Sequence, residues 1–159
     1  MESLGQFIYR YEAEINFEYR QIIPYCLLRY EDRFFATQRL KGDSRLVGQY
    51  SLGIGGHIEK VDRQQRSLIR NGLKREISEE VDILSGIGSL DMAGIICSDA
   101  TEVDRVHFGL VYIALLKDAD VRVKETDKLK GMWIDKSDLL AMSEKFEVWS
   151  QICLQNFVI

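Results

Sequence analysis

The chain has 159 residues, of which 46% are hydrophobic and 29% are charged, and its formal net charge is −4. This length favours a single domain, 1–159, with enough apolar side chains for a proper core. The acidic balance and the lack of a Lys- and Arg-rich cluster argue against nucleic acid or an anionic membrane as a partner.

The first part of the chain is predicted to form mainly strands. Residues 7–15 alternate weakly between apolar and polar side chains and predict an N-terminal edge strand. Further strands are expected at 25–30, 33–38 and 50–54, each rich in aromatic or aliphatic side chains. Glu31-Asp32 separates the first two of these and predicts a tight hairpin turn.

A long helix is predicted after the 50–54 strand. Asp62, followed by Gln65, has the spacing of a helix N-cap with its capping-box partner, and the helix would continue to about residue 81. Its apolar positions are Leu68, Ile69, Leu73, Ile77 and Val81. The last four recur every four residues and share one face that can pack on the core. Gly72 destabilises such a helix by about 1 kcal/mol relative to alanine and allows a kink there.

The second half of the chain predicts further strands followed by two helices. The strands are expected at residues 92–97, 106–116 and 133–134. Asp135 or Ser137 is positioned to cap a short helix, and a final helix is expected to begin at Ser143. Strands in the middle of the chain with helices on their flanks favour an α/β (α+β) fold, an α/β/α sandwich around a mixed β-sheet.

Three glutamates are clustered in the long helix. Glu76, Glu79 and Glu80 occupy positions i, i+3 and i+4, so their carboxylates project from one helix face. Like charges at this spacing destabilise a helix unless something neutralises them, and hard oxygen ligands suit Mg²⁺ or Mn²⁺ better than zinc. For this cluster alone, solvated glutamates on a surface helix are the simpler interpretation.

The segment before the helix favours a binding site over a solvated surface. A short apolar strand runs into Gly55 and Gly56, which permit an irregular turn and a close approach of the backbone to a ligand. A glycine-rich loop that contacts a phosphate, followed by an acidic helix that holds the metal bound to that phosphate, explains both segments together.

Together these two segments resemble the Nudix box, G-x5-E-x7-R-E-U-x-E-E-x-G-U, where U is apolar. Gly56 takes the place of the first glycine, and residues 75–80, REISEE, match the metal-binding core without a change. Three departures occur: Asp62 stands for the glutamate, the twelve residues 63–74 replace seven, and Asp82 replaces the late glycine. The intact core argues against a catalytically dead relative.

Flanking segments extend the resemblance to about residues 22–140. Gln38-Arg39 matches the QR segment that follows the family's hairpin. Residues 131–140, GMWIDKSDLL, resemble a late segment of the family, with Asp138 in its acidic position. The sequence SLGIGGHI is similar to that of a phosphoesterase-like Nudix subgroup, which says little about the substrate.

The resemblance implies metal-dependent hydrolysis of a nucleoside diphosphate linked to another group, X. Metal ions held by Glu76, Glu79 and Glu80 would neutralise phosphate oxygens and deprotonate a bound water. Glu79 is the preferred general base and Glu80 the preferred principal ligand, although the sequence does not separate these roles. Arg75 is expected to act in catalysis by orienting a carboxylate through an ion pair.

The candidates for substrate binding are Arg39, Gly55, Gly56, His57 and Glu102. His57 is expected either to contact phosphate or metal-bound water, or to face solvent as a turn histidine. Arg39 is suited to a bidentate phosphate contact, or else to a surface ion pair. Glu102, like its neighbour Asp104, could supply a further acid from a loop, but an ordinary loop acid is the simpler interpretation.

Two other functions stay open at this point. A module that binds a nucleotide without cleaving it would explain Asp62, Asp82 and the longer spacing, although the complete REISEE core opposes it. An isopentenyl-diphosphate isomerase-like enzyme shares the fold and a GGH-type turn, but it needs a catalytic cysteine, for which Cys97 is the candidate. Group X is left open because specificity lies in loops outside the box.

The cysteines and the N-terminus bear on the compartment. Cys26, Cys97 and Cys153 are far apart and odd in number, which favours reduced thiols and a cytoplasmic location. No signal-peptide pattern is visible in MESLGQF, and the longest apolar run, 110–116, is far shorter than the ~20 residues of a membrane helix.

The expected partner is a small phosphorylated molecule, with a homodimer paired through the 7–15 strand as a further hypothesis. His107, in an apolar strand, is expected to be a satisfied core residue.

Overall fold

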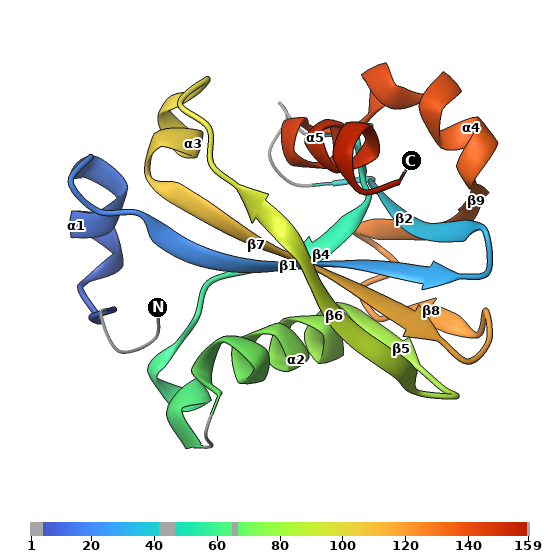
Figure 1. Cartoon of the computed structure of the whole chain (residues 1–159), viewed down its shortest axis with the longest axis horizontal. Helices are drawn as coiled ribbons and strands as arrows, with labels where there is room; N and C mark the ends of the chain where they lie inside the picture. Colours follow the sequence, from blue (N-terminus) through green and yellow to red (C-terminus); the bar gives the residue numbers. More distant parts are fainter. Residues whose placement is uncertain (1–4, 42–46, 65–66, 159) are drawn as a thin grey trace.

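The structure is a computed structural model that describes residues 5–41, 47–64 and 67–158. Its centre is a sheet whose strands run in the order β3-β2-β1-β7-β6, with β4 beside β1 and β9 beside β2 (Figure 1). These strands are β1 (Gln21–Tyr30), β2 (Arg33–Arg39), β3 (Tyr50–Ser51), β4 (Gly53–Gly55), β6 (Ile87–Ile96), β7 (His107–Leu116) and β9 (Leu129–Asp135). The pair β1–β7 is parallel and the β1–β2 and β6–β7 pairs are antiparallel, so the sheet is mixed, as predicted.

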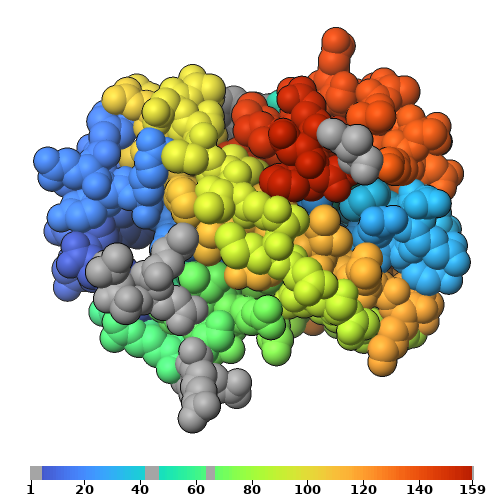
Figure 2. Space-filling model, viewed as in Figure 1, coloured from blue at the N-terminus to red at the C-terminus, as the bar shows by residue number. Residues whose placement is uncertain are grey.

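Helices cover both faces of this sheet. The α-helices are α1 (Arg10–Ile15), α2 (Leu68–Glu80), α3 (Glu102–Arg105), α4 (Lys136–Ala141) and α5 (Val148–Asn156), and the 3₁₀ helices are η1 (Lys60–Gln64) and η2 (Ser143–Lys145). In Figure 1, α2 lies on one side of the sheet and α4 and α5 lie on the other. The predicted α/β/α sandwich is therefore confirmed. Figure 2 shows the N-terminal segment and α3 on one flank of the molecule and α4 with α5 on the opposite flank.

The core consists of two clusters, one on each face of the sheet. Successive side chains of a strand point to opposite faces, so Leu27 of β1 packs with Leu154 of α5, whereas Leu28 packs with Leu73 and Ile77 of α2. Leu27 and Leu73 are fully buried. Burial of one such side chain contributes about 2 kcal/mol to the stability of the fold. Because Leu73 and Ile77 belong to the core, the predicted apolar face of α2 is confirmed.

The start of the long helix differs from the prediction. Residue 62 lies inside η1, and α2 begins at Leu68, so Asp62 is not its N-cap; Gln65 lies outside the described residues. The Asp62 carboxylate instead accepts a hydrogen bond from the Glu59 N–H at 2.8 Å and from Arg75. No break occurs at Gly72, where α2 is continuous. A Cβ there would lie 3.1 Å from Asp62 Oδ2, so the glycine lets η1 approach the helix.

The predicted N-terminal strand is wrong, because residues 10–15 form α1. The weak alternation of this segment does not correspond to a half-buried strand, since Ala13 is its buried residue and Tyr9, Tyr11 and Ile15 are more than 60% exposed. The described sheet ends at β3 and β6, so this segment offers no strand edge for pairing between copies.

The hairpin and the later strands are confirmed, with three differences. Glu31 adopts the left-handed backbone conformation (φ 52°) that closes the β1–β2 turn. The strand expected at 92–97 runs from Ile87 to Ile96, and a ribbon of β5 (Val81–Ile83) and β8 (Val121–Val123) was not predicted. The final α-helix begins at Val148 rather than at residue 143, because the Glu147 side chain accepts hydrogen bonds from the next backbone N–H groups. Among the described helices, none combines the length and apolar character needed to cross a membrane.

Candidate active site

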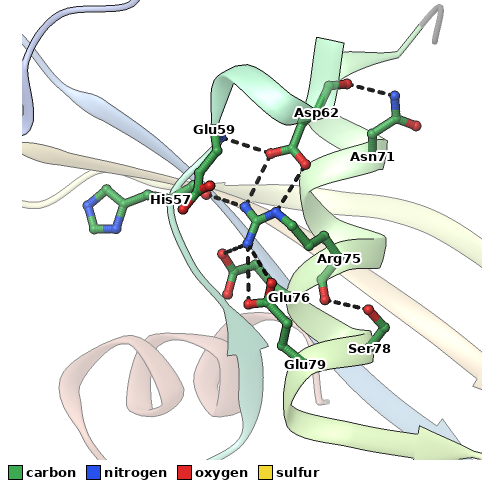
Figure 3. A network of polar contacts seen from close by, with 8 residues as sticks. All are labelled: His57, Glu59, Asp62, Asn71, Arg75, Glu76, Ser78 and Glu79. Carbon is green, nitrogen blue, oxygen red and sulfur yellow. Dashed lines mark hydrogen bonds and ion pairs between the residues drawn. The ribbon is translucent and has the colours of Figure 1, made fainter. Parts of the chain in front are cut away.

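Arg75, in the second half of α2, is the centre of the polar network around the acidic helix (Figure 3). Its Nε lies 3.1 Å from Asp62 Oδ1 and its Nη2 lies 3.2 Å from Asp62 Oδ2, which makes a bidentate ion pair. Nη2 also donates to the His57 carbonyl at 2.7 Å. Through these contacts Arg75 joins both η1 and the glycine-rich turn to α2. The hydrogen bond to Asp62 is the main reason why the pKa of Arg75 is raised.

The same guanidinium holds two of the three clustered glutamates. Nη1 of Arg75 donates to Glu76 Oε1 at 2.8 Å and to both carboxylate oxygens of Glu79 at 3.3 Å. Glu79 remains 56% exposed, whereas the Glu76 side chain is 15% exposed. This is the carboxylate-orienting arrangement that the sequence suggested for Arg75.

Gly56 lies directly over the carboxylate of Glu76. A Cβ on Gly56 would lie 2.4 Å from Glu76 Oε2, and a Cβ on Gly55 would lie 2.4 Å from the Pro24 carbonyl oxygen. The Gly55 contact is with backbone, so that position requires glycine, whereas a side chain at position 56 would push the Glu76 carboxylate away from its place beneath the turn. The close approach covers Glu76, and burial is the main reason why its pKa is raised.

Glu80, the last residue of α2, carries a carboxylate that is poorly compensated. Burial, followed by the charge of Glu76, raises the pKa of Glu80 to about 7, and the charge of Arg39 opposes this shift. Among the described residues, its carboxylate has no hydrogen-bond or ion-pair partner. Glu125 adds a further negative charge nearby.

The donor set fits a hard divalent cation. Glu76, Glu79 and Glu80 supply oxygen atoms only, and their mutual repulsion contributes to the raised pKa values of Glu76 and Glu80. Within the described ranges, no three His, Cys, Asp or Glu side chains are already arranged around a common metal position. The hydrogen bonds from Arg75 account for part of this, because they hold Glu76 and Glu79 toward the guanidinium.

Comparisons with known proteins identify the family of this chain. The chain matches no protein-family model. It is 33% identical over 150 residues to Protein YmaB of Bacillus subtilis (strain 168), covering 89% of this chain and 73% of that protein. It is 35% identical to Tm1382, a candidate Nudix hydrolase of known crystal structure, with a TM-score of 0.83 over 97% of this chain and 79% of the other.

The chain belongs to the Nudix hydrolase superfamily. Nudix hydrolases act on nucleoside diphosphates and other pyrophosphates and generally use divalent metal ions. A more distant likeness is to the Nudix domain of Shewanella oneidensis NrtR, solved with ADP-ribose, which is 13% identical with a TM-score of 0.67 over 86% of this chain and 85% of that one. At that identity the likeness concerns the fold.

The departures from the Nudix box leave this arrangement intact. Asp62, in place of the usual glutamate, still reaches Arg75 with both oxygens and is 4% exposed. Of the residues between Asp62 and Arg75, 63 and 64 lie in η1 and 68–74 lie in α2. Asp82 lies on β5, where its carboxylate is 3.1 Å from Lys124 Nζ, so it pairs at the surface.

The His57 side chain points away from the carboxylates (Figure 3). Its Nε2 lies 3.2 Å from Nε2 of His107, whose Nδ1 is 2.7 Å from the Val103 carbonyl. His107 is partly exposed, so the expectation of a core histidine is wrong. Burial, followed by the charge of Arg10, lowers the pKa of His57 to about 4, which leaves its ring neutral at pH 7.

The remaining candidates lie around the site at different distances from its centre. Arg39, at the end of β2, is close enough to Glu80 for its charge to lower that pKa, and it lines a cleft of about 100 Å³ with Tyr50. Glu102 is exposed on α3 and contacts none of the clustered glutamates among the interactions described. Asp104 is buried and accepts from Trp149 Nε1 at 3.0 Å, so it has a structural role.

Two features of this Nudix hydrolase were missed in the sequence. Glu59, inside the GGHIEKVD segment, is close enough for its charge to raise the pKa of Glu76. A cavity of about 800 Å³ lies between the N-terminal segment and the 57–59 turn. Glu59 could have been found from its position in the box, whereas the cavity has no sequence signal because it forms between distant segments.

Proposed function

We propose that this Nudix hydrolase cleaves a phosphoanhydride bond of a nucleoside diphosphate linked to a group X, with Mg²⁺ or Mn²⁺ as the cofactor. The observation that carries the proposal is the clamped carboxylate cluster. Arg75 and Gly56 hold Glu76 in place, while the half-buried carboxylate of Glu80 has no hydrogen bond or ion pair among the described residues. Three carboxylates that share one guanidinium keep a net negative charge, which is suited to a divalent cation.

Glu76, Glu79 and Glu80 would hold the cation, which supplies charge neutralisation for the phosphate oxygens and a more acidic bound water. Of the three, Glu79 is the best placed to accept a proton from water. It is 56% exposed, and its contacts with Arg75 are long, at 3.3 Å, so an oxygen can leave the guanidinium at little cost.

The other residues of the site bind and orient. Gly56 brings the backbone against the Glu76 carboxylate, and Gly55 lies against β1, so we expect this turn to present backbone N–H groups to a phosphate at the cation. Arg39, whose charge acts on Glu80, is suited to a phosphate oxygen near the cation. The ADP-ribose bound by the NrtR domain makes ADP-ribose the first nucleotide derivative to test.

The structure also bears on the competing functions. The intact pair of Asp62 with Arg75 removes one argument for a module that binds without cleaving. Cys97, the candidate for an isomerase-like cysteine, is exposed just beyond β6 and near Arg20, and no interaction described joins it to the clustered glutamates. Both observations favour hydrolysis.

The test is product release from a panel of nucleoside diphosphate derivatives, including ADP-ribose, in Mg²⁺, Mn²⁺ or EDTA. We expect cleavage of at least one member that stops in EDTA and falls at least 100-fold in Glu79→Gln. Glu144→Gln, on an exposed residue of η2, is the matched control and should keep wild-type activity. A wild-type protein that binds a panel member with the metal but cleaves none would support the binding module instead.

A further inference from the structure

The cavity of about 800 Å³ lies between the N-terminal segment and the start of α2, and its lining includes residues 57–59 but none of the clustered glutamates. In Figure 1 the N-terminal segment with α1 stands at one end of the sheet, next to the turn that leads into η1. This volume falls within the range of about 300–1,000 Å³ that is usual for ligand pockets. It is large enough for a nucleoside-sized group.

The polar lining of the cavity is rich in guanidinium groups, supplied by Arg10, Arg20 and Arg63. Arg20 is already engaged, because it donates to Asp99 and to the carbonyl of Ser98. The other two are more available to a ligand.

The guanidinium carbon of Arg63 lies over the ring of Phe7, 4.5 Å from its centroid, and no carboxylate among the described residues pairs with Arg63. Arg10 pairs with Glu14 at 2.8 Å, but that pair is exposed and therefore weak. The lining also includes the carboxylates of Glu18 and Glu59. Stacking on Phe7 fixes the Arg63 guanidinium at the cavity wall, in a geometry that suits a phosphate.

A single stretch of chain separates the cavity from the clustered glutamates. The His57 carbonyl accepts from Arg75 while the rest of His57 lines the cavity. In the same way, the Glu59 N–H donates to Asp62 while Glu59 also lines the cavity. A ligand with its pyrophosphate at the glutamates needs to extend only across this one stretch for its far end to reach the cavity.

We propose that the cavity receives the half of the substrate beyond the pyrophosphate, and that this half carries an additional phosphate bound by Arg63 and Arg10. The proposal rests on the hydrolase function above and adds a substrate class to it. The aromatic ring of Phe7 and the aliphatic side chains of Ile22 and Ile58 would contact the uncharged part of this group. The charged lining favours a phosphorylated group over a neutral sugar because guanidinium binds phosphate in bidentate fashion.

The test uses pairs of substrates that differ by one phosphate, namely NADP⁺ with NAD⁺ and coenzyme A with 3′-dephospho-coenzyme A. We expect wild-type kcat/KM to be higher for the phosphorylated member of a pair. Arg63→Gln should lower that ratio about tenfold, mainly through KM, as expected for the loss of one charge-assisted contact. Arg70→Gln, an exposed arginine of α2 outside the cavity lining, is the matched control and should keep the ratio.

Two results would overturn the proposal: no preference within either pair, or an equal effect of the two substitutions. If the wild type cleaves neither pair, the hydrolase function fails for these compounds, but the cavity is still testable by calorimetric titration of each pair in Mg²⁺. Tighter binding of the phosphorylated members that is lost in Arg63→Gln would support the phosphate site. Equal binding of both members would refute it. Thermal melting of the variant checks that the fold is kept.

Discussion

Glu80 makes a quantitative prediction about the metal-free protein. Its pKa is raised from 4.5 to about 7, which corresponds to at most about 3 kcal/mol against the ionised form in the folded state. Because the folded pKa is the higher one, the folded state binds more protons between pH 4.5 and 7. The free energy of unfolding should therefore fall as the pH rises through this window, and the full penalty should be present above about pH 7.

The perturbation is Glu80→Gln, which removes the charge and keeps the shape. In EDTA at pH 8 the variant should be more stable than the wild type by about 1–3 kcal/mol, and the two should converge near pH 5. Urea denaturation followed by circular dichroism at several pH values measures this difference. Mg²⁺ should stabilise the wild type more than the variant, because it binds the folded carboxylate cluster.

Parallel pH profiles for the two proteins in EDTA would refute this reasoning, because they would mean that Glu80 is ionised at no cost. Glu144→Gln is the control for loss of a carboxylate at an exposed site, and it should leave the pH profile unchanged. The Glu80→Gln variant should also lose most of its metal-dependent activity. A variant that is more stable but less active would show that the Glu80 carboxylate serves function at a cost in stability.

Three further substitutions test the framework of the site. Gly56→Ala places a Cβ 2.4 Å from the Glu76 carboxylate and should lower kcat about 100-fold in the hydrolase assay, with a loss of stability of about 1 kcal/mol in urea. Asp62→Ala leaves Arg75 without its bidentate partner and should lower the free energy of unfolding by about 3 kcal/mol. Leu73→Ala opens a cavity in the α2 face of the core and should cost about 2–5 kcal/mol, with kcat changed less than by Gly56→Ala.

A specific experimental result would contradict each of these three predictions. An active Gly56→Ala variant would mean that Glu76 need not stay beneath the glycine turn. An Asp62→Ala protein as stable as the wild type would show that the pair with Arg75 is replaceable by water, and Asp62→Glu should then also be neutral. A small effect of Leu73→Ala would indicate that α2 shifts to fill the space, which peptide hydrogen exchange in α2 would reveal.

The sequence by itself determined the features that depend on short spacings. The i, i+3, i+4 positions of Glu76, Glu79 and Glu80 follow from helix geometry alone, and so does the apolar face with Leu73 and Ile77. The β1–β2 hairpin was predictable because a short polar turn separates two apolar runs. Such patterns do not depend on the particular fold, provided that one side of the helix or strand faces a core.

The tertiary structure decided where these elements begin and what their polar groups contact. Asp62 had the spacing of a helix cap, but the guanidinium of Arg75, thirteen positions later, outcompetes the helix N-terminus for its carboxylate. Residues 10–15 form a helix that lies outside the described sheet.

The contact between His57 and His107 and the cavity beside it are also tertiary features. His57 and His107 are fifty positions apart in the sequence, and the cavity lining draws on residues from Gly5 to Ile69. Periodicity reports which side of an element is apolar, but it carries no information about which distant segment will supply the partner of a charged or polar group. For that reason the carboxylate cluster and an ion pair of Arg75 with it could be predicted from the sequence, whereas the pairing of Asp62 with Arg75 and the neighbouring cavity required the fold.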